Sequence, residues 1–255
     1  MYKPVKELGQ NFLTDSLIAR NMVEALSIRS HEDVIEIGPG LGVLTQILAD
    51  KVRGTGARLF AVEIDARFSI KLGQMFRSYP DVSIVTKNIL DYLPRYQSER
   101  EFKILGSLPY YITSPIVHKI IKMKVQPKTC VLLVQKEVAD KITNTAPDSS
   151  YLSSFVQAFY SVEFLNKIPR IMFNPVPDVD GGVIRLIKKE KSFGPQFIER
   201  YEGFLHKAFA HPRKMLNKVF TKDELVLGGV KSDWRPQNLD ARQWLDFFFV
   251  LHPDI

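Results

Sequence analysis

Three alternate glycines directly after an apolar segment constrain the fold of this chain more than any other feature. Residues 33–37 read DVIEI, and the chain continues as Gly38-Pro-Gly40-Leu-Gly42. Glycine lets the backbone turn sharply and approach a ligand closely, so the pattern predicts a strand, a binding loop and a helix in that order. Val43 stands where a dinucleotide fingerprint needs its third glycine, and no Gly-Lys-Ser/Thr sequence follows, which excludes a P-loop.

Short apolar runs alternate with amphipathic stretches over the first 190 residues, a pattern typical of a parallel α/β sheet. The expected strands are 34–37, 59–62, 82–86, 104–106 and 129–134, and the expected helices are 44–50, 67–76, 116–123 and 137–144. Two later segments, 162–165 and 182–187, are expected to close the sheet edge as an antiparallel hairpin. The proline-containing link between them predicts a stiff loop.

Beyond residue 190 the apolar spacing becomes helical, with expected helices at 195–209, 213–220 and 240–251. The chain of 255 residues therefore divides into two expected domains, 1–190 and 191–255. The expected fold is a Rossmann-like, mostly parallel α/β sheet followed by a small all-helical domain. The aromatic run at 247–249 is interpreted as helix core.

Positive charge is concentrated in one part of the sequence. The formal net charge is +7, and no acidic residue lies between Glu101 and Glu137. That stretch contains six lysines: Lys103, Lys119, Lys122, Lys124, Lys128 and Lys136. Such a cluster favours contact with a phosphate backbone over a merely solvated helix face, because lysine side chains neutralise phosphates.

Several classes of site are not expected. The single cysteine, Cys130, lies in an apolar run, which excludes a disulfide framework and a Cys-rich zinc site and fits a reducing cytoplasm. The five histidines show no metal-ligand spacing, so we expect no metal. The first residues have no apolar core of the kind a secretory signal needs, and no run approaches the ~20 apolar residues of a membrane span.

Glu63 ends the second expected strand, 21 residues after Gly42. A carboxylate at this place can accept hydrogen bonds from both hydroxyls of a ribose. The strand, the G-x-G-x-G loop and the strand-end glutamate together resemble the class I S-adenosylmethionine-dependent methyltransferases. The alternative is a tight strand–helix turn beside a solvated acid.

A tetrapeptide, Ser107-Leu108-Pro109-Tyr110, follows the next expected strand after 82–86. A polar residue, an X-Pro step and an aromatic form the layout of methyltransferases that act on the exocyclic amine of adenine. The Leu108 carbonyl and the Ser107 hydroxyl are candidate acceptors for the amine N–H groups, and Tyr110 could stack on an extruded base. The alternative is a turn with a core aromatic.

With these segments together, the sequence resembles the ribosomal RNA adenine N6-dimethyltransferases from Gly9 to about residue 251. The motifs are Gly9-Gln-Asn-Phe-Leu13 and residues 36–42, 63–65, 88–90, 107–110, 134–137, 173–180 and 208–218. The resemblance implies S-adenosylmethionine as the cofactor and ribosomal RNA of the small subunit as the substrate. It implies a ribosome-biogenesis enzyme that acts as a monomer in the cytoplasm.

The resemblance also assigns residues. The implied cofactor-binding residues are Gln10, Asn11, Leu13, Gly38, Gly40, Gly42, Glu63, Ile64, Asn88, Ile89 and Ser107. The implied catalytic residues are Ser107, Leu108, Pro109, Tyr110 and Phe173, with the target adenine held between Phe173 and Tyr110. The expected RNA-binding residues are Lys119, Lys122 and Lys124, placed on a helix just after the tetrapeptide, and Arg213, Lys214 and Lys218.

The chain departs from the family pattern in places. Ser107 replaces asparagine, which predicts a slower enzyme, and Asn88 replaces aspartate, where we expect little loss. Pro212 replaces an arginine, which bears on RNA docking only. Two alternatives therefore stay open. One is a large-subunit methyltransferase of the antibiotic-resistance type, although the segment 208–218 favours the small-subunit type. The other is a weakly active or non-catalytic ribosome-assembly factor. A small-molecule methyltransferase is disfavoured by the aromatic pair and the lysine-only stretch.

Overall fold

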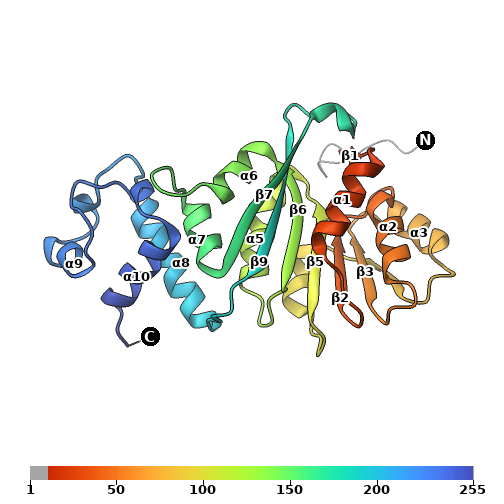
Figure 1. The fold of residues 1–255 in the computed structure, drawn as a ribbon, viewed down its shortest axis with the longest axis horizontal. Helices are drawn as coiled ribbons and strands as arrows, with labels where there is room; N and C mark the ends of the chain where they lie inside the picture. Colours follow the sequence, from red (N-terminus) through yellow and green to blue (C-terminus); the bar gives the residue numbers. More distant parts are fainter. Residues whose placement is uncertain (1–10, 255) are drawn as a thin grey trace. The chain divides into compact units, whose positions relative to one another are not determined.

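The computed structural model describes residues 11–254 and consists of two compact units. The sheet unit comprises Met1–Ala139 and Glu163–Lys188, and the helical unit comprises Asp140–Val162 and Lys189–Ile255 (Figure 1). The expected boundary near residue 190 separates 189–255 from the sheet, but residues 140–162 also belong to the helical unit. Helix α6 (Lys136–Thr143) crosses from one unit into the other.

The sheet has the strand order β4-β3-β2-β5-β6-β9-β7. Its members are β2 (Asp33–Ile37), β3 (Arg58–Glu63), β4 (Val82–Thr86), β5 (Phe102–Ser107), β6 (Thr129–Gln135), β7 (Tyr160–Ile168) and β9 (Gly181–Lys188). The first five strands in this order run parallel, and β9 runs antiparallel to β6. The predicted strands and the Rossmann-like fold class are confirmed, with β7 and β9 at the edge expected for the closing pair.

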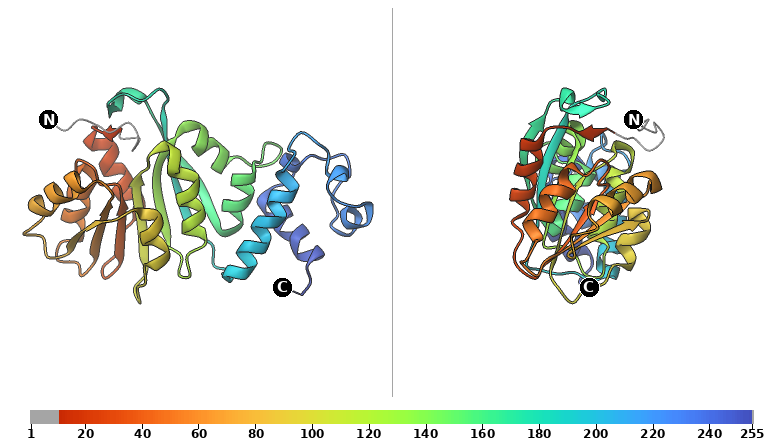
Figure 2. Two further views of the ribbon diagram at one scale, coloured as in Figure 1. Left: turned by 180° about the vertical axis from the view of Figure 1, so that it is seen from behind. Right: turned by 90° about the vertical axis from the view of Figure 1, so that its right-hand side faces the viewer.

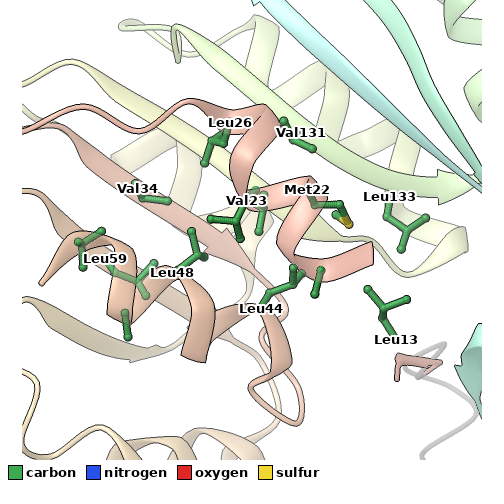
Figure 3. Packing of buried hydrophobic residues seen from close by; sticks show 14 of the residues in the cluster. Leu13, Met22, Val23, Leu26, Val34, Leu44, Leu48, Leu59, Val131 and Leu133 are labelled. Carbon is green, nitrogen blue, oxygen red and sulfur yellow. The ribbon is translucent and has the colours of Figure 1, made fainter. Parts of the chain in front are cut away.

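Helices cover both faces of the sheet. On one face α1 (Ser16–Leu26), α2 (Val43–Val52) and α3 (Ala66–Met75) contribute to a single apolar cluster with the strands. Figure 3 shows Met22 and Leu26 of α1 beside Val131 and Leu133 of β6. The left view of Figure 2 shows α5 (Thr113–Ile121) in front of the strands, on the other face, and the short α4 (Ile89–Tyr92) contacts it. Burying each such Leu or Met contributes about 1.5–3 kcal/mol to stability.

Helix α1 and a two-stranded sheet were not predicted. The Asp15 side chain caps α1 by accepting hydrogen bonds from the backbone N–H groups of Leu17 and Ile18. Strand β1 (Phe12–Leu13) pairs antiparallel with β8 (Phe173–Asn174), in the link that was expected to be only a loop. This pairing brings together the implied site segments 9–13 and 173–180, which are far apart in the sequence.

The helical unit is held together by aromatic side chains. Its helices are α7 (Tyr151–Phe159), α8 (Pro195–Phe209), α9 (Lys222–Leu227) and α10 (Ala241–Leu251). Tyr201 of α8 and Phe248 of α10 are fully buried, with ring centroids 5.4 Å apart. This confirms that the 247–249 run contributes to a helix core. None of the helices within residues 11–254 is long and apolar enough to cross a membrane.

The predicted helix at 213–220 is wrong. Only one 3₁₀ turn, Leu216–Lys218, forms there. The backbone N–H of Leu216 donates to the carbonyl of Trp234 at 2.7 Å, and that of Asn217 to Ser232 at 3.3 Å. Because these N–H groups pair with a distant segment, they are not available for helical bonds four residues back.

Candidate active site

Four of the implied site residues lie in a row at the carboxyl edge of the sheet. Asn88 follows β4, Glu63 ends β3, Gly38 follows β2 and Ser107 ends β5. Since these strands are neighbours in the order β4-β3-β2-β5, the four residues follow one another across the edge. Carboxyl ends of parallel strands are where open α/β sheets bind ligands.

The glycine loop is shaped to approach a ligand. Gly40 has φ +53°, and a Cβ there would lie 2.8 Å from the ring of Phe12. Its backbone N–H donates to Glu63 Oε2 at 3.0 Å, which ties the loop to the end of the next strand. Only glycine fits this position, because both the backbone conformation and the space exclude a side chain.

Gly42 lies at the end of the loop, and its expected role in binding the cofactor stays a prediction. It is the N-cap of α2 with φ +89°, and a Cβ there would lie 2.8 Å from the Leu72 side chain. It is not among the residues that line the cavity. Gly42 therefore leaves room for the Leu72 side chain of α3 beside the start of α2.

Glu63 is 5 % exposed and both of its carboxyl oxygens accept backbone hydrogen bonds. Oε2 accepts from Gly40 at 3.0 Å and Oε1 from Asp65 at 2.9 Å. Burial raises the pKa of Glu63, and the two N–H donors act against that rise. Each oxygen keeps a further lone pair, so the carboxyl can still accept the hydroxyls of a ribose.

Glu36 is a second acid close to this site, but it does not line the cavity. It is fully buried in the middle of the sheet, and neither carboxyl oxygen has a hydrogen-bond partner within residues 11–254. Burial raises the pKa of Glu36 to about 8; the nearby Thr45 hydroxyl opposes the rise and the charge of Glu63 adds to it. Glu36 is therefore protonated at neutral pH.

A cavity of about 340 Å³ opens at this edge. The implied residues that line it are Asn11, Leu13, Gly38, Gly40, Glu63, Ile64, Asn88, Ile89, Ser107, Leu108, Pro109 and Phe173. Gln10 and the side chain of Tyr110 lie outside the described part of the chain. Sequence reasoning missed Phe12, Phe68, Lys87 and Tyr111, which also line the cavity. Phe12 lies between Asn11 and Leu13, which the resemblance assigns to the cofactor site, so its place in the sequence could have identified it.

Two acceptors of the tetrapeptide have no hydrogen-bond partner in the described part of the chain. Its backbone is fixed because the Leu108 N–H donates to Leu133 of β6 at 2.9 Å. The Pro109 carbonyl already accepts hydrogen bonds from the Ile112 N–H and the Thr113 hydroxyl, at 3.2 and 3.3 Å. By contrast, no hydrogen bond within residues 11–254 uses the Leu108 carbonyl or the Ser107 hydroxyl. These two oxygens remain available to a ligand in the cavity.

Asn88 is the N-cap of α4. Its side-chain oxygen accepts a hydrogen bond from the Leu90 N–H at 2.9 Å, and no partner for its amide nitrogen lies in the described residues. From asparagine in place of aspartate here we expect little loss. The cap occupies one lone pair of this oxygen and leaves the second, so an adenine amine would share the oxygen with the cap.

The lysine-only stretch does not converge on the cavity as the sequence suggested. Lys103 is buried at the amino end of β5, where it pairs with Glu32 at 2.8 Å, and Lys128 pairs with Glu101 at 2.8 Å. Helix α5 ends at Ile121, so Lys119 lies in its last turn and the exposed Lys122 and Lys124 follow it.

The direction of α5 explains this correction. The helix begins at Thr113, next to the cavity, and must run back to the amino end of β6. Its nine residues advance ~13 Å along that path, which carries the three lysines away from the tetrapeptide. In the helical unit, Arg213, Lys214 and Lys218 are all exposed, and no ion pair in the described residues involves them.

The remaining expectations concern cysteine and metals. Cys130 is fully buried in β6, and burial raises the pKa of its thiol far above the usual range, so the thiol is inert. Within residues 11–254 no group of three or more His, Cys, Asp or Glu side chains could hold a metal ion.

A doubly wound sheet with a glycine loop, a buried strand-end acid and a strand-end tetrapeptide around one cavity defines a class I methyltransferase. The profile described as "Ribosomal RNA adenine dimethylase" matches residues 2–251. The chain therefore belongs to the ribosomal RNA adenine dimethylase family, whose methyl donor is S-adenosylmethionine. The resemblance found in the sequence is confirmed.

Two relatives illustrate the match. The chain is 33% identical over 269 residues to "Ribosomal RNA small subunit methyltransferase A" of Levilactobacillus brevis, covering 97% of this chain and 90% of that protein. It is 28% identical over 258 residues to the protein of the same name from Sulfurihydrogenibium sp., covering 99% and 98%.

Solved structures show the same fold. The 23S rRNA methyltransferase ErmE has a TM-score of 0.76 and 28% identity, covering 94% of this chain and 99% of that chain. A dimethyladenosine transferase from Plasmodium falciparum has a TM-score of 0.79 at 24% identity, covering 95% and 98%.

Proposed function

We propose that this protein transfers methyl groups to N6 of adenosines in small-subunit ribosomal RNA, two to each target adenosine. The observation that carries the proposal is that the Ser107 hydroxyl and the Leu108 carbonyl have no hydrogen-bond partner within residues 11–254. Both residues line the cavity that Glu63 also lines. S-adenosylmethionine supplies an electrophilic sulfonium methyl group when bound. Names of relatives such as that from Levilactobacillus brevis support the small-subunit substrate.

The residues of the cavity fit this cofactor. Glu63 would hold the ribose hydroxyls, and the glycine backbone at 38–40 would lie against the amino-acid part. Because Asn88 and Ser107 lie at opposite ends of the row across the sheet edge, Asn88 would hold the adenine of the cofactor and Ser107 would lie at its methyl end. Asn11, Leu13, Ile64 and Ile89 complete the proposed binding surface.

The tetrapeptide would activate the target amine. Its lone pair is delocalised into the adenine ring, and acceptors around its N–H groups favour a more tetrahedral nitrogen. As this nitrogen bonds to the methyl carbon, the sulfonium carbon–sulfur bond would break to leave a thioether, and the amine would lose one N–H proton. We assign these acceptors to the Leu108 carbonyl and the Ser107 hydroxyl, and base stacking to Tyr110 and Phe173. A monomethylated amine keeps one N–H, so a second transfer can follow the same path.

RNA docking is assigned to exposed cations. Arg213, Lys214 and Lys218 would bind phosphates in the helical unit. Lys119, Lys122 and Lys124 stay proposed contacts, but with RNA away from the target adenosine. We also propose that the protein is cytoplasmic and monomeric. Light scattering after gel filtration would check the oligomeric state.

The decisive experiment supplies labelled S-adenosylmethionine with unmethylated small subunits or large subunits, and maps the modified adenosines. We expect N6-dimethyladenosine in small-subunit RNA alone. Label in large-subunit RNA would identify the antibiotic-resistance type. Cofactor binding without label on either subunit would identify a non-catalytic assembly factor.

A further inference from the structure

Tyr111 is a cavity-lining aromatic that the proposed mechanism does not use. It is 58 % exposed, whereas Phe173, which lines the same cavity, is 3 % exposed. No hydrogen bond or ring contact within residues 11–254 involves the Tyr111 side chain. Of these two aromatic residues that line the cavity, Phe173 is therefore buried and Tyr111 is largely open to solvent.

The backbone holds Tyr111 in place. It lies in a 3₁₀ turn, Tyr110–Ile112, between Pro109 and the start of α5. The Ile112 N–H closes this turn by donating to the Pro109 carbonyl at 3.2 Å. Because this hydrogen bond closes the turn and α5 follows directly, the backbone of Tyr111 is held on both sides.

The chemistry at the rim points to a nucleobase. An enzyme that modifies a base must draw that base out of its stack, which leaves the neighbouring base without one of its partners. Single-stranded RNA is commonly bound by stacking such bases on exposed aromatic side chains, and this contact tolerates any base. A large apolar ring beside the target cavity offers that surface.

We infer that Tyr111 stacks on the nucleobase adjoining the target adenosine and thereby holds the RNA at the cavity. This inference rests on the proposed RNA methylation. It makes Tyr111 a substrate-binding residue: it touches the RNA but neither the methyl group nor the amine. Its loss should weaken RNA binding while leaving the cofactor site intact.

The test compares Tyr111→Ala, Tyr111→Phe and Tyr111→Leu with the unchanged protein. We expect Tyr111→Ala to raise the KM for unmethylated small subunits about 5- to 100-fold, as loss of one stacked base implies, with kcat changed less. Tyr111→Phe keeps the ring and should stay within threefold, while Tyr111→Leu should fall between them. The Kd for S-adenosylmethionine, measured by calorimetry, should stay within twofold in every variant.

A second readout separates this inference from the proposed function. Fluorescence anisotropy with a labelled single-stranded RNA hexamer measures RNA affinity without methyl transfer. Weaker binding by Tyr111→Ala would support stacking even if no subunit were methylated. Unchanged KM and RNA affinity in Tyr111→Ala, alongside an active unchanged protein, would overturn the inference alone. Equal losses in Tyr111→Phe and Tyr111→Ala would overturn it too, because the hydroxyl would then make the contact.

Discussion

The backbone N–H of Gly40 donates to Glu63 Oε2 at 3.0 Å, joining two residues that stand 23 positions apart in the chain. The same carboxyl accepts from Asp65 through its other oxygen at 2.9 Å. Glu63 therefore orients the glycine loop as well as offering acceptors to a ribose. The ribose contact that we propose for Glu63 would couple the shape of the loop to cofactor binding through this one side chain.

Replacing this carboxylate should weaken cofactor binding. In Glu63→Gln the amide keeps one acceptor oxygen, but its NH₂ group faces an N–H donor and one ribose hydroxyl loses its acceptor. We expect the Kd for S-adenosylmethionine to rise about 10- to 100-fold by calorimetry, since hydrogen bonds to charged groups contribute about 1.5–3 kcal/mol. The exposed Glu199 provides the control variant Glu199→Gln, which should bind normally. Equal affinities would refute the role of Glu63.

Asn88→Asp should tighten cofactor binding. A carboxylate can cap Leu90 with one oxygen and accept from the adenine amine with the other, whereas the amide oxygen of Asn88 already serves the cap at 2.9 Å. We expect about a three- to tenfold lower Kd, equivalent to one added hydrogen bond. Asn88→Ala should bind more weakly and destabilise α4. A Kd in Asn88→Asp equal to or above that of the unchanged protein would contradict this account.

Ser107→Asn should raise turnover. The longer amide reaches further toward the target amine than the hydroxyl, and one better hydrogen bond in the transition state corresponds to about a two- to tenfold higher kcat. Ser107→Ala, which removes the acceptor, should lower kcat by a similar factor. Single-turnover methylation of small subunits measures both. An Asn variant no faster than the unchanged protein would show that the serine is already sufficient.

Stability should fall as the pH rises, because of Glu36. Its pKa is about 8 in the folded protein against the ordinary 4.5, so between these values the folded protein keeps a proton that the unfolded chain has lost. The free energy of unfolding from this group therefore decreases from about pH 4.5 to about pH 8, by on the order of a few kcal/mol. Denaturant unfolding of Glu36→Gln across pH 5–9 should lack this decrease. Parallel curves for the two proteins would rule out Glu36 as its source.

The exposed cations of the helical unit should control the salt dependence of RNA binding. Replacing Arg213, Lys214 and Lys218 by alanine should reduce the slope of log K against log salt by about 2, at roughly 0.7 per lost phosphate contact. The matched triple variant removes Lys119, Lys122 and Lys124. It should affect binding of whole subunits but not of a short target hairpin, because these lysines lie away from the cavity. An unchanged slope in the first variant would exclude that docking surface.

Much of the sheet unit followed from local pattern. The glycine loop, Glu63 and the tetrapeptide were found because apolar runs, turn residues and strand ends can be recognised within short stretches of sequence. The helix α1 was missed although Asp15 caps it, since no apolar run marked its start. The helix expected at 213–220 failed because Leu216 pairs with Trp234, a partner that local spacing does not reveal.

The residues alone were sufficient for the family, the cofactor and the reaction, because the chemistry requires particular groups at particular strand ends. The residues alone were not sufficient to predict which partners those groups find in the folded protein. The pairing of β1 with β8, the hydrogen bond that occupies Asn88, and the burial of Lys103 with Glu32 depend on segments far apart in the chain. A residue's type states which interactions it can make, and packing selects the partner that it finds.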